Sequence, residues 1–220
     1  MLSKSFVFND FRVITYIVFD EFTKKGIIID PGCNNQNEQK RLINFINKND
    51  IKLSAIVNTH GHLDHICGNK FLKETFNIPI LAHEKEIPNF EAALSYSELF
   101  DFKFEESPHP DKFIKEGDKI TFGNSFLYVI ETPGHTAGSI SLLSEKKEAL
   151  FSGDLLFKGS IGRTDLPGGN LDVLYDTLKN KILKLPEKTV VFAGHGYETT
   201  IGEEIKNNPF ILELLNNKNA

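Results

Sequence analysis

The sequence has few cysteines, no long hydrophobic run and no basic block, and each absence excludes a class of protein. Its 220 residues include two cysteines, Cys33 and Cys67. Cys67 closely follows a histidine cluster, where a cross-link would disturb side-chain placement, so we expect a reducing compartment rather than a disulfide framework. No segment reaches the roughly 18 apolar residues that span a bilayer, and residues 1–6 lack the apolar core of a signal peptide. We therefore expect a cytoplasmic protein without membrane contact.

The composition is that of a globular protein that does not bind nucleic acid. The net charge is −5, and no cluster of lysine and arginine stands out. Hydrophobic residues make up 40% of the chain and charged residues 25%, the usual balance of a soluble domain. A chain of this length can bury a substantial core. We expect one domain over residues 1–220, present as a monomer or small homo-oligomer.

Short apolar runs alternate with helical patterns along the whole chain, with no linker between them. Strands are expected at 12–19, 26–29, 53–57, 78–82, 119–122, 126–130, 139–143, 149–152 and 190–193. Helices are expected at 39–48, 70–76, 171–183 and 199–215, the last with a break near Pro209. Residues 84–116 predict short helices and loop that cover one side of a site. This order predicts an α/β protein with two mixed sheets facing each other and helices outside, an αββα sandwich.

Residues 60–65 contain three histidines and an aspartate, a dense set of potential metal ligands. The segment reads His60-Gly61-His62-Leu63-Asp64-His65. A lone buried histidine is more often an ordinary core residue, but this spacing seldom arises by chance in a chain with seven histidines. Further candidates follow in glycine-marked positions, namely His135, Asp154 and His195. Each comes just after an expected strand, where a rigid backbone presents side chains to a cleft.

These residue types favour a centre of two divalent metal ions. Imidazole and carboxylate suit zinc, and also iron or manganese. In an extended turn His60 and His62 can share one ion, with His135 closing its ligand set. Asp64 and His65 can serve the second ion, together with His195, and Asp154 can bridge the two. Two metals about 3.5–4 Å apart can share a hydroxide that is nucleophilic at neutral pH. Asp64 and Asp154 are thus the candidate catalytic carboxylates.

Other polar residues carry weaker signals. His83 follows an expected strand and His109 lies between two prolines, and for both an ordinary structural role is the simpler interpretation. The two cysteines have no cysteine-protease context, and Cys67 is interpreted as a small packing residue. A Ser-His-Asp triad is not required, because a metal-bound hydroxide would supply the nucleophile.

The ligand pattern, from the strand ending in Asp30-Pro31-Gly32 to the turn around His195, resembles the metallo-β-lactamase superfamily over nearly the whole chain. It is most similar to the glyoxalase II-like branch, the hydroxyacylglutathione hydrolases, through residues 59–62, 153–157 and 162–165. The resemblance implies the same assignment of ligands: one ion takes His60, His62 and His135, the other takes Asp64, His65 and His195, and Asp154 is shared. It also implies the αββα fold.

The resemblance implies three further site residues. Arg163 and Tyr197 match positions that contact glutathione in glyoxalase II, and a guanidinium suits a substrate carboxylate. A second interpretation is that Arg163 pairs with Asp165 to brace its loop. Asp30 is expected to orient a ligand histidine, although an aspartate before Pro-Gly also suits a plain turn. Known glyoxalase II enzymes carry a longer helical C-terminal region, which is not expected here, so strict glutathione specificity does not follow.

The leading hypothesis is hydrolysis of a small-molecule thioester such as S-lactoylglutathione by the bridging hydroxide. The chain also resembles the persulfide dioxygenases of the same superfamily, including the loop from Gly162 to Asp165. There one iron would be held by His60, His135 and Asp154. Hydrolysis of lactones, β-lactams or other esters would use the same metal centre. A non-catalytic binding protein would be expected to have lost ligands, and this chain retains all seven.

Overall fold

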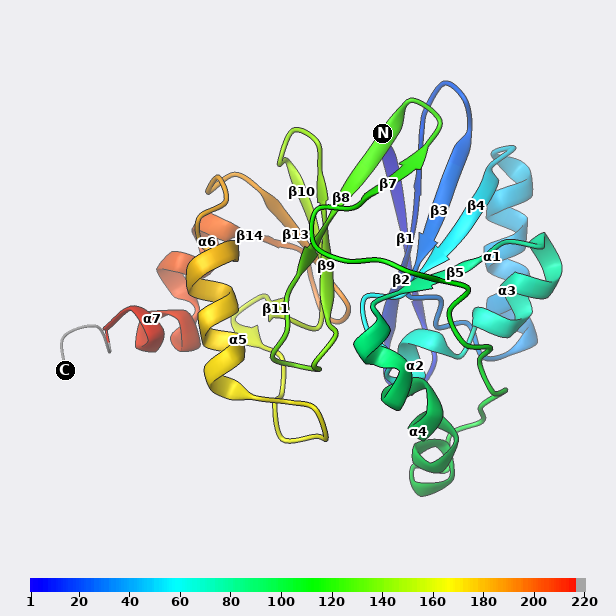
Figure 1. Ribbon diagram of the computed structural model, residues 1–220. Helices are drawn as coiled ribbons and strands as arrows, with labels where there is room; N and C mark the ends of the chain where they lie inside the picture. Colours follow the sequence, from blue (N-terminus) through cyan, green and yellow to red (C-terminus); the bar gives the residue numbers. More distant parts are fainter. Residues whose placement is uncertain (217–220) are drawn as a thin grey trace. The chain divides into compact units, whose positions relative to one another are not determined.

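The computed structural model describes residues 1–216 and divides into two compact units (Figure 1). Unit 1 comprises Met1–Ile114 and Lys119–Phe126, and unit 2 comprises Lys115–Asp118 and the chain from Leu127 onward. Each unit contains one mixed β-sheet with its own helices, so each is described by itself. The expectation of a single domain over residues 1–220 stays a prediction.

The sheet of unit 1 has six strands in the order β1-β2-β3-β4-β5-β6. β1, β2 and β3 pair antiparallel, whereas β3, β4, β5 and β6 pair parallel. The strands of the unit are β1 (Leu2–Phe8), β2 (Val13–Phe19), β3 (Lys25–Ile29), β4 (Lys52–Val57), β5 (Ile80–Ala82), β6 (Lys112–Phe113) and β7 (Lys119–Phe122). Its helices are α1 (Gln36–Lys48), α2 (Leu63–Ile66), α3 (Asn69–Phe76), the short 3-10 helix η1 (Glu84–Glu86) and α4 (Ile87–Leu99).

The core of unit 1 forms because apolar faces of α1 and α3 pack on the sheet. Leu42 and Ile46 of α1 and Leu72 of α3 are fully buried in one cluster with residues of β1 to β5. The side chain of Asn35 begins α1 by accepting hydrogen bonds from the backbone N–H groups of Asn37 and Glu38, which compensates for donors that have no partner within the helix. The packing of α1 and α3 holds the strands of the sheet in place.

The second sheet has six strands, and the five that are assigned to unit 2 have the order β14-β13-β10-β9-β8. β10 and β13 pair parallel, and the other neighbours pair antiparallel. The strands are β8 (Ser125–Glu131), β9 (Ile140–Ser144), β10 (Ala149–Gly153), the small hairpin β11 (Leu156–Phe157) and β12 (Ser160–Ile161), β13 (Val190–Ala193) and β14 (Thr199–Thr200). The helices are α5 (Leu171–Thr177), the π-helical turn η2 (Leu178–Ile182), α6 (Ile201–Asn207) and α7 (Pro209–Asn216).

The core of unit 2 joins the helices to one face of its sheet. Leu174, Leu178 and Ile182 recur at helical spacing through α5 and η2, and all three are fully buried. They pack in one cluster with strand residues such as Leu150 and Val191. In Figure 1 these helices are the yellow-to-red ribbons beside β10 and β13.

The structure confirms most expected elements and revises two. Residues 84–116 contain the short η1, the longer helix α4 of 13 residues and the strand β6, where short helices and loop were expected. Pro88 does not interrupt α4, because it lies in the first turn, where a missing N–H costs nothing. β1 was not expected, because among its last three residues only Phe6 and Phe8 are buried and the first four residues are exposed. The helix expected at 199–215 is α6 and α7, separated at Asn208 before Pro209.

Among the helices of residues 1–216, none has the length and apolar content that a membrane span requires.

Candidate metal centre

Two parallel strands of unit 1 bring Asp30 and His60 to the same edge of its sheet. Asp30 directly follows β3, and His60 comes three residues after β4. The carboxyl ends of parallel neighbours lie side by side, as is usual where ligands bind α/β sheets. A ligand atom from each of Asp30, His60 and His65 lies within 4.8 Å of the others. Asp30 and His60, which are 30 positions apart in the chain, thus belong to one buried cluster of polar atoms.

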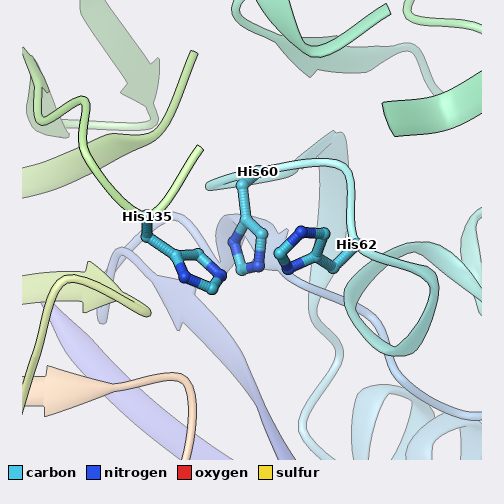
Figure 2. Close-up of side chains that lie close together, drawn as sticks. All are labelled: His60, His62 and His135. Atoms are coloured by element: carbon cyan, nitrogen blue, oxygen red, sulfur yellow. The ribbon is translucent and has the colours of Figure 1, made fainter. Parts of the chain in front are cut away.

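The rings of the histidine cluster lie close together. The centroids of His60 and His62 are 4.7 Å apart with an edge-to-face arrangement, and those of His60 and His65 are 4.0 Å apart. Figure 2 shows His60 and His62 extending from one short loop with their rings adjacent; His135, also drawn there, belongs to unit 2. Gathered imidazoles of this kind are a suitable donor set for a divalent cation.

The Thr59 hydroxyl, which donates to Asp30, fixes which nitrogen of His60 carries its proton. The Thr59 hydroxyl lies 2.6 Å from Asp30 Oδ2 and must donate to it, since an ionised carboxylate only accepts. The single hydroxyl proton is then used, so the contact of 3.1 Å between Thr59 Oγ1 and His60 Nδ1 has the imidazole as donor. His60 Nε2 therefore carries the lone pair that a metal needs.

Asp30 also contacts His65 directly, on the Nδ1 side of its ring. Its Oδ2 lies 3.0 Å from His65 Nδ1, while its Oδ1 accepts from the backbone N–H of Thr59 at 2.7 Å. His65 Nε2 is on the other side of the ring, 3.6 Å from Asp64 Oδ2. Asp30 thus makes the contact expected of a residue that orients a ligand, and its role in metal binding stays a prediction.

The parallel pair β10 and β13 in unit 2 brings Asp154 and His195 together. Asp154 directly follows β10 and His195 comes two residues after β13. Asp154 Oδ2 lies 3.5 Å from His195 Nε2 and 3.8 Å from His135 Nε2. One carboxylate oxygen therefore faces the Nε2 atoms of both histidines, the arrangement that a shared ligand requires.

His135 is held by a tight turn and by a backbone carbonyl. A side chain at Gly134 would overlap Leu174 of α5, and Gly134 also has a positive φ of 138°, so the turn requires glycine. His135 Nδ1 lies 2.7 Å from the carbonyl oxygen of Arg163. Because a carbonyl only accepts, Nδ1 carries the proton and Nε2 the lone pair that faces Asp154.

Each unit offers donors that suit divalent cations. Four imidazoles and two carboxylates supply Nε2 and oxygen donors, and a fifth histidine, His62, begins α2 in a partly buried position. Carboxylate oxygens and imidazole nitrogens compensate for the cost of removing a cation from water. The chemistry open to such a set is the activation of water and the polarisation of a carbonyl group.

Comparison with known proteins identifies the family. The model of the metallo-β-lactamase superfamily matches residues 10–195, a range that includes all seven expected ligands. The chain belongs to the metallo-β-lactamase superfamily. The α/β fold class with two mixed sheets, expected from the sequence, is thereby confirmed.

Two relatives in this superfamily cover nearly the whole chain. An uncharacterized protein of Aquifex aeolicus is 43% identical over 202 residues, which is 91% of this chain and 92% of the relative. The hydroxyacylglutathione hydrolase GloC of Haemophilus influenzae is 36% identical over 197 residues, which is 89% of this chain and 92% of that enzyme.

Solved structures of this superfamily have the same fold. BLEG-1 B3 metallo-β-lactamase is 36% identical with a TM-score of 0.86, covering 96% of this chain and 99% of its own. TTHA1623 in a di-iron-bound form is 32% identical with a TM-score of 0.84, covering 94% and 99%. ETHE1 from Myxococcus xanthus is 27% identical with a TM-score of 0.78, covering 100% and 92%.

The two expected substrate contacts of this metallo-β-lactamase superfamily member are exposed. The Arg163 guanidinium binds the Asp165 carboxylate through two bonds of 2.7 Å, and the two side chains are 59% and 68% exposed. Tyr197 is 80% exposed. The pair with Asp165 is the bracing interaction that the sequence left open, and substrate binding by Arg163 and Tyr197 stays a prediction.

The ion pair predicts an acid titration that can be observed directly. Hydrogen bonds from Arg163 lower the pKa of Asp165 from 3.8 to about 2. A lowered pKa in the folded state gives a contribution that is present above pH 3.8 and lost as the pH falls toward 2. At pH 3 we expect Asp165 to be mostly ionised in the wild type and mostly protonated in Arg163→Ala, measured by carboxyl carbon NMR shifts. Equal midpoints in both proteins would contradict the pair in solution.

Residues that sequence reasoning missed hold the ligand loops in place. The Asn58 amide donates to the carbonyl of His65 at 3.1 Å, and the Asn9 amide donates to the carbonyl of Asp64, also at 3.1 Å. Glu86 accepts from the backbone N–H of Gly61 at 2.7 Å. Thr59 and Asn58 adjoin the motif and so could have been noticed, whereas Asn9 and Glu86 are distant in sequence and gave no signal.

The cysteines and the two remaining histidines lie apart from this chemistry. Cys33 and Cys67 are buried and carry free thiols. Burial raises the pKa of Cys33 to about 12 and that of Cys67 well above its usual value, so neither is a thiolate nucleophile at neutral pH. His83 caps η1 by accepting from the Lys85 N–H, and His109 is exposed.

Proposed function

We propose that the protein is a metal-dependent hydrolase of small-molecule thioesters of the hydroxyacylglutathione type. The observation that carries the proposal is the complete ligand series, in the order of the superfamily, with Nδ1 of His60 and His135 hydrogen-bonded and Nδ1 of His65 3.0 Å from the Asp30 carboxylate. The 36% identity to a hydroxyacylglutathione hydrolase, GloC, supports the substrate class.

In this proposal residues 1–220 act as one domain that binds two divalent ions. Zinc is the favoured metal, and iron or manganese also suits the ligands. His60, His62 and His135 would hold one ion; Asp64, His65 and His195 would hold the other, and Asp154 would be shared. Bound in this way, the ions would supply a hydroxide at neutral pH and polarise the thioester carbonyl. The di-iron form of TTHA1623 supports a centre of two metals.

The residues of the chain have separate tasks in this hypothesis. Thr59, Asp30 and the carbonyl of Arg163 contact Nδ1 of His60, His65 and His135, which leaves Nε2 of each ring to bind a metal. Asp64 and Asp154 supply the negative charge that offsets the cations. The leaving thiol has a pKa of about 8.5, so it departs as a thiolate without a strong general acid. The reaction therefore needs no general acid, in agreement with a site that consists of metal ligands alone.

Substrate contacts are proposed for Arg163 and Tyr197. A substrate carboxylate can bind a guanidinium through two parallel hydrogen bonds, and Arg163 already holds a carboxylate, that of Asp165, in this geometry. The exposed phenol of Tyr197 lies two residues beyond His195.

Two other activities have a specific observation in their favour. Similarity to BLEG-1 B3 metallo-β-lactamase supports hydrolysis of β-lactams on the same centre. The loop from Gly162 to Asp165, which resembles that of the persulfide dioxygenases, favours persulfide dioxygenation with one iron on His60, His135 and Asp154. The thioesterase proposal rests instead on the identity to GloC over most of both chains.

One experiment separates these activities. Metal content is measured by elemental analysis, and the same preparation is assayed with S-lactoylglutathione, a lactone, a cephalosporin and glutathione persulfide with oxygen uptake. We expect two metals per chain and fastest turnover of the thioester, abolished by a chelator and restored by zinc. One iron per chain with oxygen uptake would refute the hydrolase. Faster turnover of the cephalosporin than of the thioester would refute the preference for thioesters.

A further inference from the structure

A buried glutamate lies against the loop that joins two of the proposed ligands. Glu86 ends η1 and is fully buried. Its Oε2 accepts from the backbone N–H of Gly61 at 2.7 Å and from the side-chain amide of Asn89 at 2.8 Å. Gly61 is the residue between His60 and His62, so the carboxylate binds the loop at the centre of the ligand pair.

The first turn of α4 packs on the same glycine. A Cβ atom on Gly61 would lie 2.9 Å from Asn89 Cβ, 2.9 Å from Phe90 Cδ2 and 3.2 Å from the carbonyl oxygen of Glu86. Phe90 is buried and belongs to the apolar cluster that joins α4 to α2. Backbone and helix are therefore in direct contact, and the loop has little room to shift between them.

Burying a carboxylate at this contact is energetically unfavourable if its role is packing alone. Burying a charged group is unfavourable unless hydrogen bonds and neighbouring charges compensate. These two hydrogen bonds come from neutral donors, and bonds of this kind to a carboxylate are stronger than those to a neutral acceptor. A negative charge beside the loop that carries His60 and His62 also lowers the energy of a dication bound by their imidazoles.

We infer that Glu86 is a positioning residue of the metal centre, which fixes the Gly61 amide and thereby the spacing of His60 and His62 before metal binds. The inference rests on the metal centre of the proposed function and adds to it a residue outside the ligand series. Glu86 acts through the backbone, so its effect is on metal affinity and ligand geometry.

The test compares zinc affinity of the metal-free full-length proteins, measured by competition with a chelating dye. Glu86→Ala removes both hydrogen bonds, and we expect zinc to bind about 10–100-fold more weakly. Glu86→Gln keeps an acceptor of the same reach and should recover most of that loss. Glu84→Gln is the matched control, because Glu84 lies on the same turn and is exposed; its affinity should stay within about twofold of the wild type.

Two further readouts separate positioning from folding. We expect faster hydrogen exchange confined to the Gly61 amide and its neighbours in Glu86→Ala, and an altered visible absorption spectrum of its cobalt form; a uniform loss of stability would instead speed exchange of buried amides throughout the protein. A folded Glu86→Ala with wild-type zinc affinity would overturn the inference. Should that variant not fold, Glu86→Asp replaces it, since the shorter side chain withdraws from Gly61; unchanged affinity there overturns the inference too.

The same measurement distinguishes the role of Glu86 from the existence of the metal centre. A wild-type protein that binds no zinc would refute the metal centre of the proposed function. Zinc binding by the wild type that Glu86→Ala leaves unchanged would refute only the role of Glu86.

Discussion

Asp154→Ala is expected to lose metal and to lower thioester turnover by more than about 100-fold. Asp154 Oδ2 lies between the Nε2 atoms of His135 and His195, at 3.8 and 3.5 Å, so its removal takes a shared donor from both proposed ions. Loss of partners outside the ligand set already costs 10–100-fold in affinity or activity, and a direct ligand should cost more. The measurements are metal content and kcat/KM for S-lactoylglutathione.

Asp172→Ala is the control for this variant, because Asp172 lies on the exposed first turn of α5 in the same unit. It should keep its metal and its turnover. An Asp154→Ala protein that retains two metals and unchanged kcat/KM would remove Asp154 from the site and end the proposed mechanism.

Asp30→Ala should destabilise the metal-free protein by about 3 kcal/mol or more. The buried carboxylate accepts from the Thr59 backbone and hydroxyl, and it contacts His65 Nδ1 at 3.0 Å. Its loss leaves these donors buried without that acceptor, and each such group costs about 1–3 kcal/mol. The free energy of unfolding is measured with urea in the presence of a chelator, so that metal binding does not contribute.

Asp50→Ala is a matched control for the backbone strain in this comparison. Asp30 and Asp50 both have a positive φ, 48° and 53°, and alanine in that region costs about 1–2 kcal/mol. Asp50 is exposed, so its substitution measures the strain alone. Equal losses for the two variants would show that the carboxylate of Asp30 contributes nothing to the fold.

Strongly patterned elements of the fold could be predicted from the sequence, and weakly patterned ones could not. The strand at Val190–Ala193 and the apolar face of α1 are local periodicities, because the side chains that decide them are close in sequence. The exposed half of β1 gave no such signal, since β2 supplies its pairing. The length of α4 was not expected, because a sequence does not show that Pro88 lies in the first turn of a helix, where it is tolerated.

The same division holds within the site. The candidate ligands could be named from the sequence because His60 to His65 form a local motif and His135, Asp154 and His195 each follow an apolar strand; their binding of metal stays a prediction. The partners that fix the imidazoles were less accessible. Only Asp30 was expected to contact a ligand histidine, whereas the carbonyl of Arg163 could not be assigned to His135, because any backbone carbonyl can accept.

The sequence by itself determined which side chains are available as metal donors and the family to which the chain belongs. Residue type and spacing are written directly in the chain, and they sufficed for both. The tertiary structure decided which nitrogen of His60 and His135 keeps its proton, and which buried carboxylates hold the loops of the candidate ligands. Those choices depend on atoms from Asp30, Glu86 and Arg163, each more than 20 residues away from its partner, and such pairs come together only when strands and helices pack.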